Sequence, residues 1–207
     1  MTLFIMGVTE RRHRQKEELR LEILAAAGEL FAKEGYENVS MRRIAEKIEY
    51  SPTTIYLYFR DKRELIDEIC NQTFALLSKR LEKVNEAGED PVERLKAGLK
   101  AYIEFGIKHP DQYRVAFMTP CDAVCDGVVK TQGPGARAFQ YLTQGVAECI
   151  QAGLFRETDV LAVSQSLWLV IHGVTALKIT HATAFPWIEH ERLVNLTLDT
   201  ALRGLLK

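Results

Sequence analysis

Residues 40–62 read SMRRIAEKIEYSPTTIYLYFRDK, and this stretch decides how the rest of the chain is interpreted. Ser40 is a good N-cap for a short helix that carries Ile44, Ala45 and Ile48. A second short helix begins at Pro52, a residue favoured in a first turn, and runs to about Phe59. Two short helices joined by a tight turn behind an amphipathic helix form a helix-turn-helix, the arrangement that places its second helix in the DNA major groove.

The outward positions of the second short helix carry hydroxyl groups and compact rings, which suit base contacts and phosphate capture. They are Ser51, Pro52, Thr53, Thr54, Tyr56 and Tyr58. Arg60 and Lys62 follow at the start of the next helix, where a cation would reach a phosphate. Arg11, Arg12, Arg14 and Lys16 precede the first helix and form either a basic arm or a solvated tail. Tyrosines also serve simply as packing residues, so a head that never touches DNA is the alternative.

Over Ile23–Leu65 the chain carries a series of residues at characteristic spacing: Ala26-Ala27, Leu30-Phe31, Gly35-Tyr36, Val39-Ser40, Ile44-Ala45, Ser51, Thr54 to Phe59, Lys62 and Glu64-Leu65. This pattern resembles the DNA-binding domain of the TetR family of repressors. The resemblance implies a two-fold dimer of nine-helix protomers with a ligand pocket in the C-terminal domain. It further implies that Arg42 contacts DNA, that Pro52, Thr53 and Thr54 face bases, and that Tyr56, Tyr58 and Lys62 hold phosphates. One departure is Glu49, where the family usually has Gly; a left-handed Glu there would cost about 1–2 kcal/mol.

Nearly every other segment has helical periodicity, so we predict an all-α fold of about nine helices. We expect a flexible leader over residues 1–15, a DNA-binding head over 16–62 and a ligand-binding and dimerisation domain over 63–207. The first helix should run from about Lys16 to Lys33, and the long helix after Asp61 should run to about Asn85. Further helices are expected over about 91–108, 111–118, 136–152, 159–182 and 188–206.

The composition agrees with a reduced, cytoplasmic protein. Apolar residues make up 47% of the 207 residues, and four scattered cysteines are too few for a disulfide scaffold. Glu10–Arg63 holds 12 Lys and Arg against 10 Asp and Glu, whereas the whole chain has a net charge of -1. The opening apolar run is too short to span a bilayer, and we expect no later segment to combine spanning length with absence of charge. No membrane partner is therefore expected.

The segment 159–182 is apolar nearly all round and must be covered on both sides. Together with the last helix, whose two apolar stripes include small residues, it predicts a four-helix dimer interface; a monomer with a thick core is the alternative. Trp168-x-x-x-His172-Gly173 resembles a signature of one TetR subgroup. Candidate lining residues for an apolar or aromatic effector are Tyr102, Phe105, Tyr113, Phe117, Phe139, Leu142, Trp168 and His172. Core packing is the alternative for each.

We expect no enzyme, no cofactor and no metal. A nucleophile elbow, a phosphate loop, a His-Glu-x-x-His helix and clustered carboxylates are all missing from the sequence. Cys121-x-x-x-Cys125 can sense oxidants or bind metal, but nothing supplies the other two ligands of a structural zinc site. The function predicted is a repressor that binds a palindromic operator as a dimer and is released by a small molecule. A partner-binding scaffold, an activator and a constitutive repressor are the alternatives.

Overall fold

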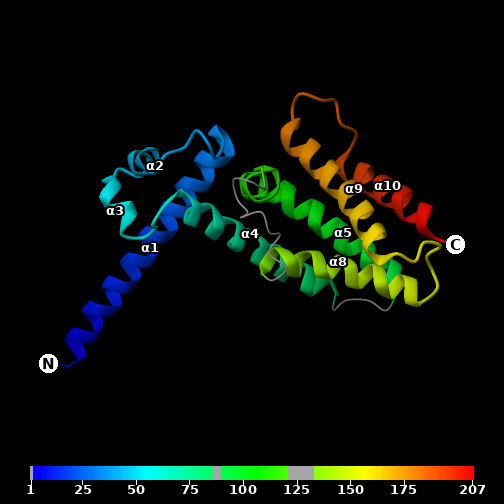
Figure 1. Cartoon of the computed structure of the whole chain (residues 1–207), viewed down its shortest axis with the longest axis horizontal. Coiled ribbons are helices and arrows are strands. Elements are labelled where there is room, and N and C mark those ends of the chain that lie inside the picture. The colour runs from blue at the N-terminus through cyan, green and yellow to red at the C-terminus, as the bar shows by residue number, and fades with distance from the viewer. Residues whose placement is uncertain (1, 86–89, 121–132) are drawn as a thin grey trace. The chain divides into compact units, whose positions relative to one another are not determined.

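The computed structural model describes residues 2–85, 90–120 and 133–207, most of which are helical and none of which lies in a β-strand (Figure 1). The all-α fold class is confirmed. By clustering of contacts the chain divides into a first unit, Met1–Gln72 with Asp111–Val129, and a second unit, Thr73–Pro110 with Lys130–Lys207. The pair Cys121 and Cys125 lies outside the described residues, as does most of the loop predicted over 119–135.

The first unit holds a long helix and the two short ones. Its helices are α1 (Thr2–Glu34), α2 (Met41–Lys47) and α3 (Pro52–Tyr56), followed by the start of α4 (Lys62–Asn85). Ile23, Ala27, Ile44, Ile55 and Leu65 are completely buried and form its core. Each comes from the apolar stripe of its own helix, which is why the stripe positions meet when the helices pack.

The start of α1 differs from the sequence-based expectation. A flexible leader was expected up to residue 15, whereas the helix begins at Thr2. Residues 10–16, ERRHRQK, consist mainly of strong helix formers, and no proline interrupts the chain before Gly35. The helix then ends as predicted: Gly35 has a φ of 83°, and its N–H donates to the carbonyl of Phe31 at 3.1 Å.

The second unit is a bundle of four helices together with most of α4. These are α5 (Pro91–Lys108), α8 (Pro134–Gln151), α9 (Val160–Thr180) and α10 (His190–Leu205), and α5 packs on the other three (Figure 1). Asp90 and Asp159 cap the N-termini of α5 and α9 by accepting two backbone N–H donors each. Between α5 and α8 the described chain forms α6 (Pro110–Tyr113) and one π-helical segment, η1 (Arg114–Met118).

Helix α9 contradicts the expectation that no later segment reaches membrane-spanning length without charge. By length and composition alone Val160–Thr180 could cross a membrane, with a mean hydropathy of 1.7, because no charged residue lies between Asp159 and Lys178. Only 28% of its most apolar window is buried, and Leu161, Leu169 and Leu177 are at least half exposed. The uncovered apolar side of α9 therefore needs an explanation beyond the core of its own chain.

Candidate nucleic-acid interface

The packing of α2 against α3 is set by small and branched side chains. Ile44, Ala45 and Ile55 are fully buried, and Phe59 is 1% exposed. Ser40 caps α2 by accepting the N–H of Arg43 at 3.1 Å. Because Ala45 carries only a methyl group, α2 and α3 can approach closely, as the helix-turn-helix interpretation requires.

The turn between the two helices is built on Glu49 in a left-handed conformation. Its φ is 60°, and it is the one non-glycine residue with positive φ in the described chain. The N–H of Tyr50 donates to Ala45 at 3.0 Å and that of Glu49 donates to Glu46 at 3.3 Å. This pair of bonds is a Schellman motif with Glu49 in the position that glycine usually takes. The sequence therefore keeps the turn of the helix-turn-helix and accepts strain at Glu49.

Helix α3 presents part of its predicted reading surface to solvent. Ser51 caps the helix, accepting the N–H of Thr54 at 3.2 Å, and the two hydroxyl oxygens lie 2.9 Å apart. Pro52 and Thr53 are exposed, and Tyr56 is 54% exposed. Ser51 and Thr54 thus hold the helix start together, while Pro52, Thr53 and Tyr56 remain available for base or phosphate contacts.

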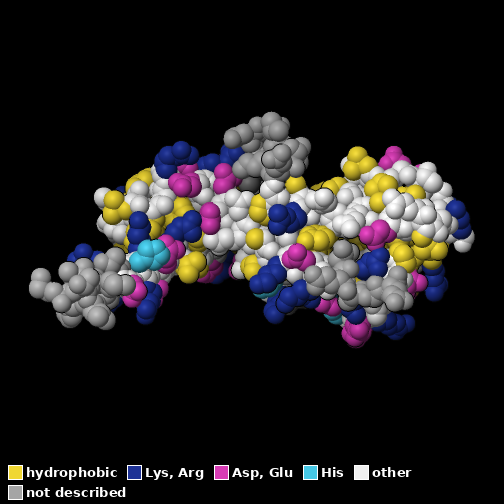
Figure 2. Space-filling model, turned by 90° about the horizontal axis from the view of Figure 1, so that it is seen from below, with side chains coloured by type: hydrophobic (Ala, Val, Ile, Leu, Met, Phe, Trp, Pro, Cys, Tyr) yellow, Lys and Arg dark blue, Asp and Glu magenta, His cyan; other side chains and the backbone are white. Residues whose placement is uncertain are grey.

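Most cations around α2 and α3 are already paired. The guanidinium of Arg42 lies 3.1 Å from Glu46, Arg43 lies 3.3 Å from Glu34, and Arg60 lies 3.0 Å from Asp61. Figure 2 shows the outcome, a face on which basic and acidic side chains are intermixed. Arg42 is nonetheless highly exposed, with 80% of its side chain accessible. Exposed pairs of this kind are weak and can exchange a carboxylate for a phosphate.

Lys62 makes two contacts inside the first unit. Its Nζ donates to the carbonyl of Tyr36 at 2.7 Å and lies 4.1 Å from the centre of the Tyr36 ring. The pKa of the Tyr36 hydroxyl is raised, mainly by burial. The ammonium has two further protons, so its expected phosphate contact stays a prediction beside this structural role.

The residues predicted to line an effector pocket fall into both units. In the second unit, Tyr102 on α5 accepts from Trp168 Nε1 at 3.3 Å and lies 3.5 Å from Nδ1 of His172. Phe139 meets Trp168 edge-on, with ring centres 6.3 Å apart. Burial lowers the pKa of His172. These four residues form one aromatic cluster from α5, α8 and α9.

The other predicted lining residues are placed differently. Phe105 is buried in the second unit, where its ring lies 4.9 Å from that of His109, and Leu142 is half-buried. Tyr113 and Phe117 belong to the first unit and stack at 4.6 Å. Two hollows in the described residues are lined by other, mainly polar, side chains. Those two hollows give the effector assignment no support.

Two residues near α3 were not singled out from the sequence. The Tyr36 carbonyl accepts a hydrogen bond from the Lys62 ammonium. Tyr50, which is 44% exposed, lines a hollow beside the helix-turn-helix. Tyr36 follows the glycine that ends α1, and Tyr50 follows the strained Glu49. Each tyrosine directly follows a left-handed turn residue, Gly35 or Glu49, and this position was the signal that could have identified it.

Comparisons with known proteins cover both parts of the chain. Residues 23–69 match the family model described as "Bacterial regulatory proteins, tetR family", and residues 95–201, about half of the chain, match "Tetracyclin repressor-like, C-terminal domain". An uncharacterised HTH-type transcriptional regulator of Haemophilus influenzae is 35% identical over 68 residues, which are 33% of this chain and 36% of that protein. The match thus spans little more than a third of that relative's length.

Two further comparisons extend over most of the chain. The HTH-type transcriptional activator FasR of Mycolicibacterium smegmatis is 24% identical over 193 residues, covering 93% of this chain and 81% of FasR. The fatty acid degradation regulator FadR from Bacillus halodurans superposes with a TM-score of 0.73 at 18% identity, covering 88% of this chain and 94% of that one. The likeness to FadR concerns the fold.

Proposed function

The chain belongs to the TetR family of bacterial regulatory proteins, and from that premise we propose that it is a dimeric repressor that binds a palindromic operator and is released by a small apolar or aromatic effector. The family consists of transcriptional regulators rather than enzymes. The observation that carries the DNA-binding proposal is α3, a short helix capped by Ser51 with Pro52, Thr53 and Tyr56 exposed. We propose that the contacting residues are Arg42, Ser51, Pro52, Thr53, Thr54, Tyr56, Tyr58 and Lys62.

The dimer proposal is supported by the uncovered sides of α9 and α10. Leu169 is 68% exposed on α9 and Leu196 is 58% exposed on α10. Large side chains at this exposure favour association, since each removes apolar area from water when a second copy covers it. A dimer also presents two copies of α3, which a palindromic operator requires at a separation of about 34–36 Å.

The effector proposal is supported by the aromatic cluster of Tyr102, Phe139, Trp168 and His172. Its few polar atoms sit among rings, the mixture typical of sites for small apolar ligands. The fold is shared with FadR, a regulator of fatty acid degradation, which is consistent with an effector of low polarity. Coupling would run through α4, whose residues belong to both units. A typical coupling is about 1–3 kcal/mol.

A regulator without an effector is the second candidate. It is favoured by one observation: the polar atoms of Tyr102, Trp168 and His172 already contact one another within the cluster. An activator is the alternative to a repressor, since the similar protein FasR is named as an activator. A reporter gene under the selected operator, read with and without the protein, separates a repressor from an activator.

The test of DNA binding begins with selection of bound sequences from random duplex DNA by the purified protein. We expect a palindromic consensus. The double variant T53A/Y56F should then weaken binding to that duplex by about tenfold, equivalent to about 1.4 kcal/mol. The matched control is T183A/Y141F, which makes the same changes in the second unit and should leave binding unchanged. No enrichment of any sequence would contradict the proposal.

The test of effector control uses the selected operator and a panel of fatty acids, sterols and aromatic acids. At least one should release the DNA, and Trp168→Ala should abolish that release while DNA binding persists. If no compound of the panel alters operator affinity, the regulator without an effector is the supported function.

A further inference from the structure

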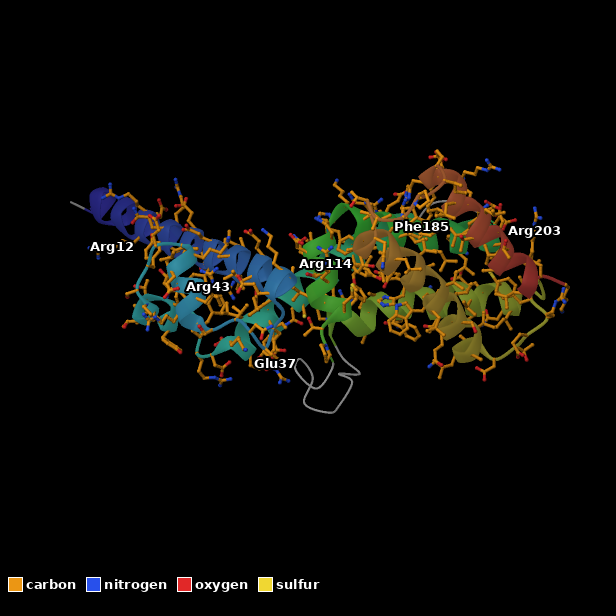
Figure 3. All side chains as sticks on the ribbon, turned by 90° about the horizontal axis from the view of Figure 1, so that it is seen from above. Arg12, Glu37, Arg43, Arg114, Phe185 and Arg203 are labelled. Carbon is orange, nitrogen blue, oxygen red and sulfur yellow. The ribbon has the colours of Figure 1, made fainter. Side chains whose placement is uncertain are left out.

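A hollow of about 510 Å³ lies within the first unit, between the N-terminal half of α1 and the helix-turn-helix. From α1 it is lined by Arg12, Gln15, Lys16, Glu18 and Leu19, and from the helix-turn-helix by Tyr50 and Tyr58. Arg12 is labelled in Figure 3 on this half of α1. The hollow therefore adjoins the exposed surface of α3 and belongs to the same unit.

The cations of this part of α1 are unusual because they have no partner among the described residues. Every other Lys and Arg in the described part of the first unit makes an ion pair or, for Lys62, a hydrogen bond. Arg11, Arg12, Arg14 and Lys16 make neither with any described residue, and all four are exposed. Any anion that approaches them therefore displaces no carboxylate.

The helical spacing sorts these charges by face. Arg12 and Lys16 are four residues apart, so they lie on one face together with Leu19 and both line the hollow. Glu10 and Glu17 lie about half a turn away, on the opposite face. Glu18 is the one carboxylate among the lining residues of the hollow. A like-charged pair at this spacing destabilises an isolated helix, and a bound anion removes that repulsion.

The opposite wall supplies neutral donors. Tyr50 is 44% exposed and precedes the cap of α3, and Tyr58 follows Tyr56 in the same segment. Tyrosine hydroxyls, arginine and lysine are the groups with which proteins hold DNA phosphates. We propose that this hollow binds the sugar-phosphate backbone of duplex DNA beside the groove that α3 enters. The inference rests on the proposed function and adds a second contact to it, made by α1.

The test measures operator affinity as a function of salt for the full-length protein. Each phosphate neutralised adds about 0.9 to the slope of log affinity against log salt. Because the proposed dimer places two copies of the hollow on the operator, the variant R12Q/K16Q removes four cations and should lower that slope by about 3.6. Between about 50 and about 200 mM salt the wild type should lose about 150-fold more affinity than this variant. Hydroxyl-radical footprinting should show protection lost at the flanks of the site and kept at its centre.

The matched control is R11Q/R14Q, which removes the same charge from the same turns of α1 but from residues outside the hollow. We expect its slope and footprint to equal those of the wild type. Circular dichroism identifies any variant that has lost helix, and Y50F/Y58F probes the hollow without changing charge; it should weaken binding with the slope retained.

The outcomes separate this inference from the proposed function. A wild type that binds no duplex DNA overturns both. Suppose that the wild type binds, and that R12Q/K16Q and R11Q/R14Q either both bind as the wild type does or are both impaired to the same degree. That result overturns only the hollow as a backbone site. Loss of affinity in R12Q/K16Q at an unchanged slope points to a small anionic ligand or a packing role and overturns it as well.

Discussion

At the scale of single residues, Glu49 shows how a site can keep its geometry after losing the residue that best suits it. The turn between α2 and α3 retains both Schellman hydrogen bonds although a side chain now occupies the left-handed position. Strain of this kind persists when the surroundings determine the conformation, here the buried Ala45 and the N-cap of α3. The orientation of α3 is thus maintained by these neighbouring residues rather than by Glu49 itself.

Replacing Glu49 by glycine should stabilise the protein. Glycine adopts a φ of 60° without a Cβ clash, so E49G should raise the free energy of unfolding by about 1 kcal/mol. Urea denaturation of the full chain measures this. E49A is the control, because it removes the carboxylate and keeps the strain; it should show no such gain. A destabilised E49G would mean that the Glu49 side chain itself holds the turn.

Lys62 should contribute to folding as well as to any DNA contact. Its bond to the Tyr36 carbonyl and its position over the Tyr36 ring are both lost in Lys62→Met. We expect the free energy of unfolding to fall by about 1–2 kcal/mol. Thermal and urea unfolding measure the change, and Lys79→Met, at an exposed site on α4, is the matched control. Equal stability of K62M and wild type would leave Lys62 as a phosphate ligand only.

At the scale of elements, α3 is the most dependent on its cap. It has five residues, fewer than a helix needs to be stable by itself, and Ser51 accepts the N–H of Thr54. Ser51→Ala should lower the free energy of unfolding by about 1 kcal/mol. Amide hydrogen exchange at residues 53–56 should accelerate, whereas exchange in α5 should not. Unchanged exchange at Thr54 would show that Pro52 alone holds the helix start.

The elements with strong local signals were predictable from the sequence. The cap Ser40 and the glycine after α1 mark where helices begin and end. Apolar periodicity predicted the core, including Ile44 and Ile55, because a stripe on one face has to be buried. The left-handed turn at Glu49 was accessible only through the family resemblance.

What depends on tertiary contacts was not predictable. No local signal marks Arg114–Met118 as π-helical. Nor does one give Lys62 the Tyr36 carbonyl as its acceptor, since that bond joins two segments 26 residues apart in the sequence. The start of α1 at Thr2 was missed because the charged, exposed residues 10–16 carry no apolar stripe and resemble a tail. The hollow beside α3 follows from that longer helix and was missed with it.

At the scale of the whole molecule, the uncovered side of α9 and the demands of DNA recognition point to the same assembly. A five-residue reading helix contacts few base pairs, so useful affinity requires two copies. An apolar helix of 21 residues with only 28% of its most apolar window buried requires cover. One two-fold dimer satisfies both requirements, and it makes DNA affinity depend on residues that contact no DNA.

That dependence can be tested with charges placed on the uncovered faces. Leu169→Glu with Leu196→Glu should give a monomer by analytical ultracentrifugation, because burying two carboxylates without partners costs several kcal/mol. Operator affinity should fall at least 100-fold although α3 is unchanged. Leu57→Glu with Leu76→Glu is a control for equally exposed leucines elsewhere, and it should stay dimeric. If the Leu169→Glu, Leu196→Glu variant stays a dimer of undiminished stability, the interface lies on other helices. If it is a monomer that keeps full operator affinity, DNA recognition does not depend on the dimer.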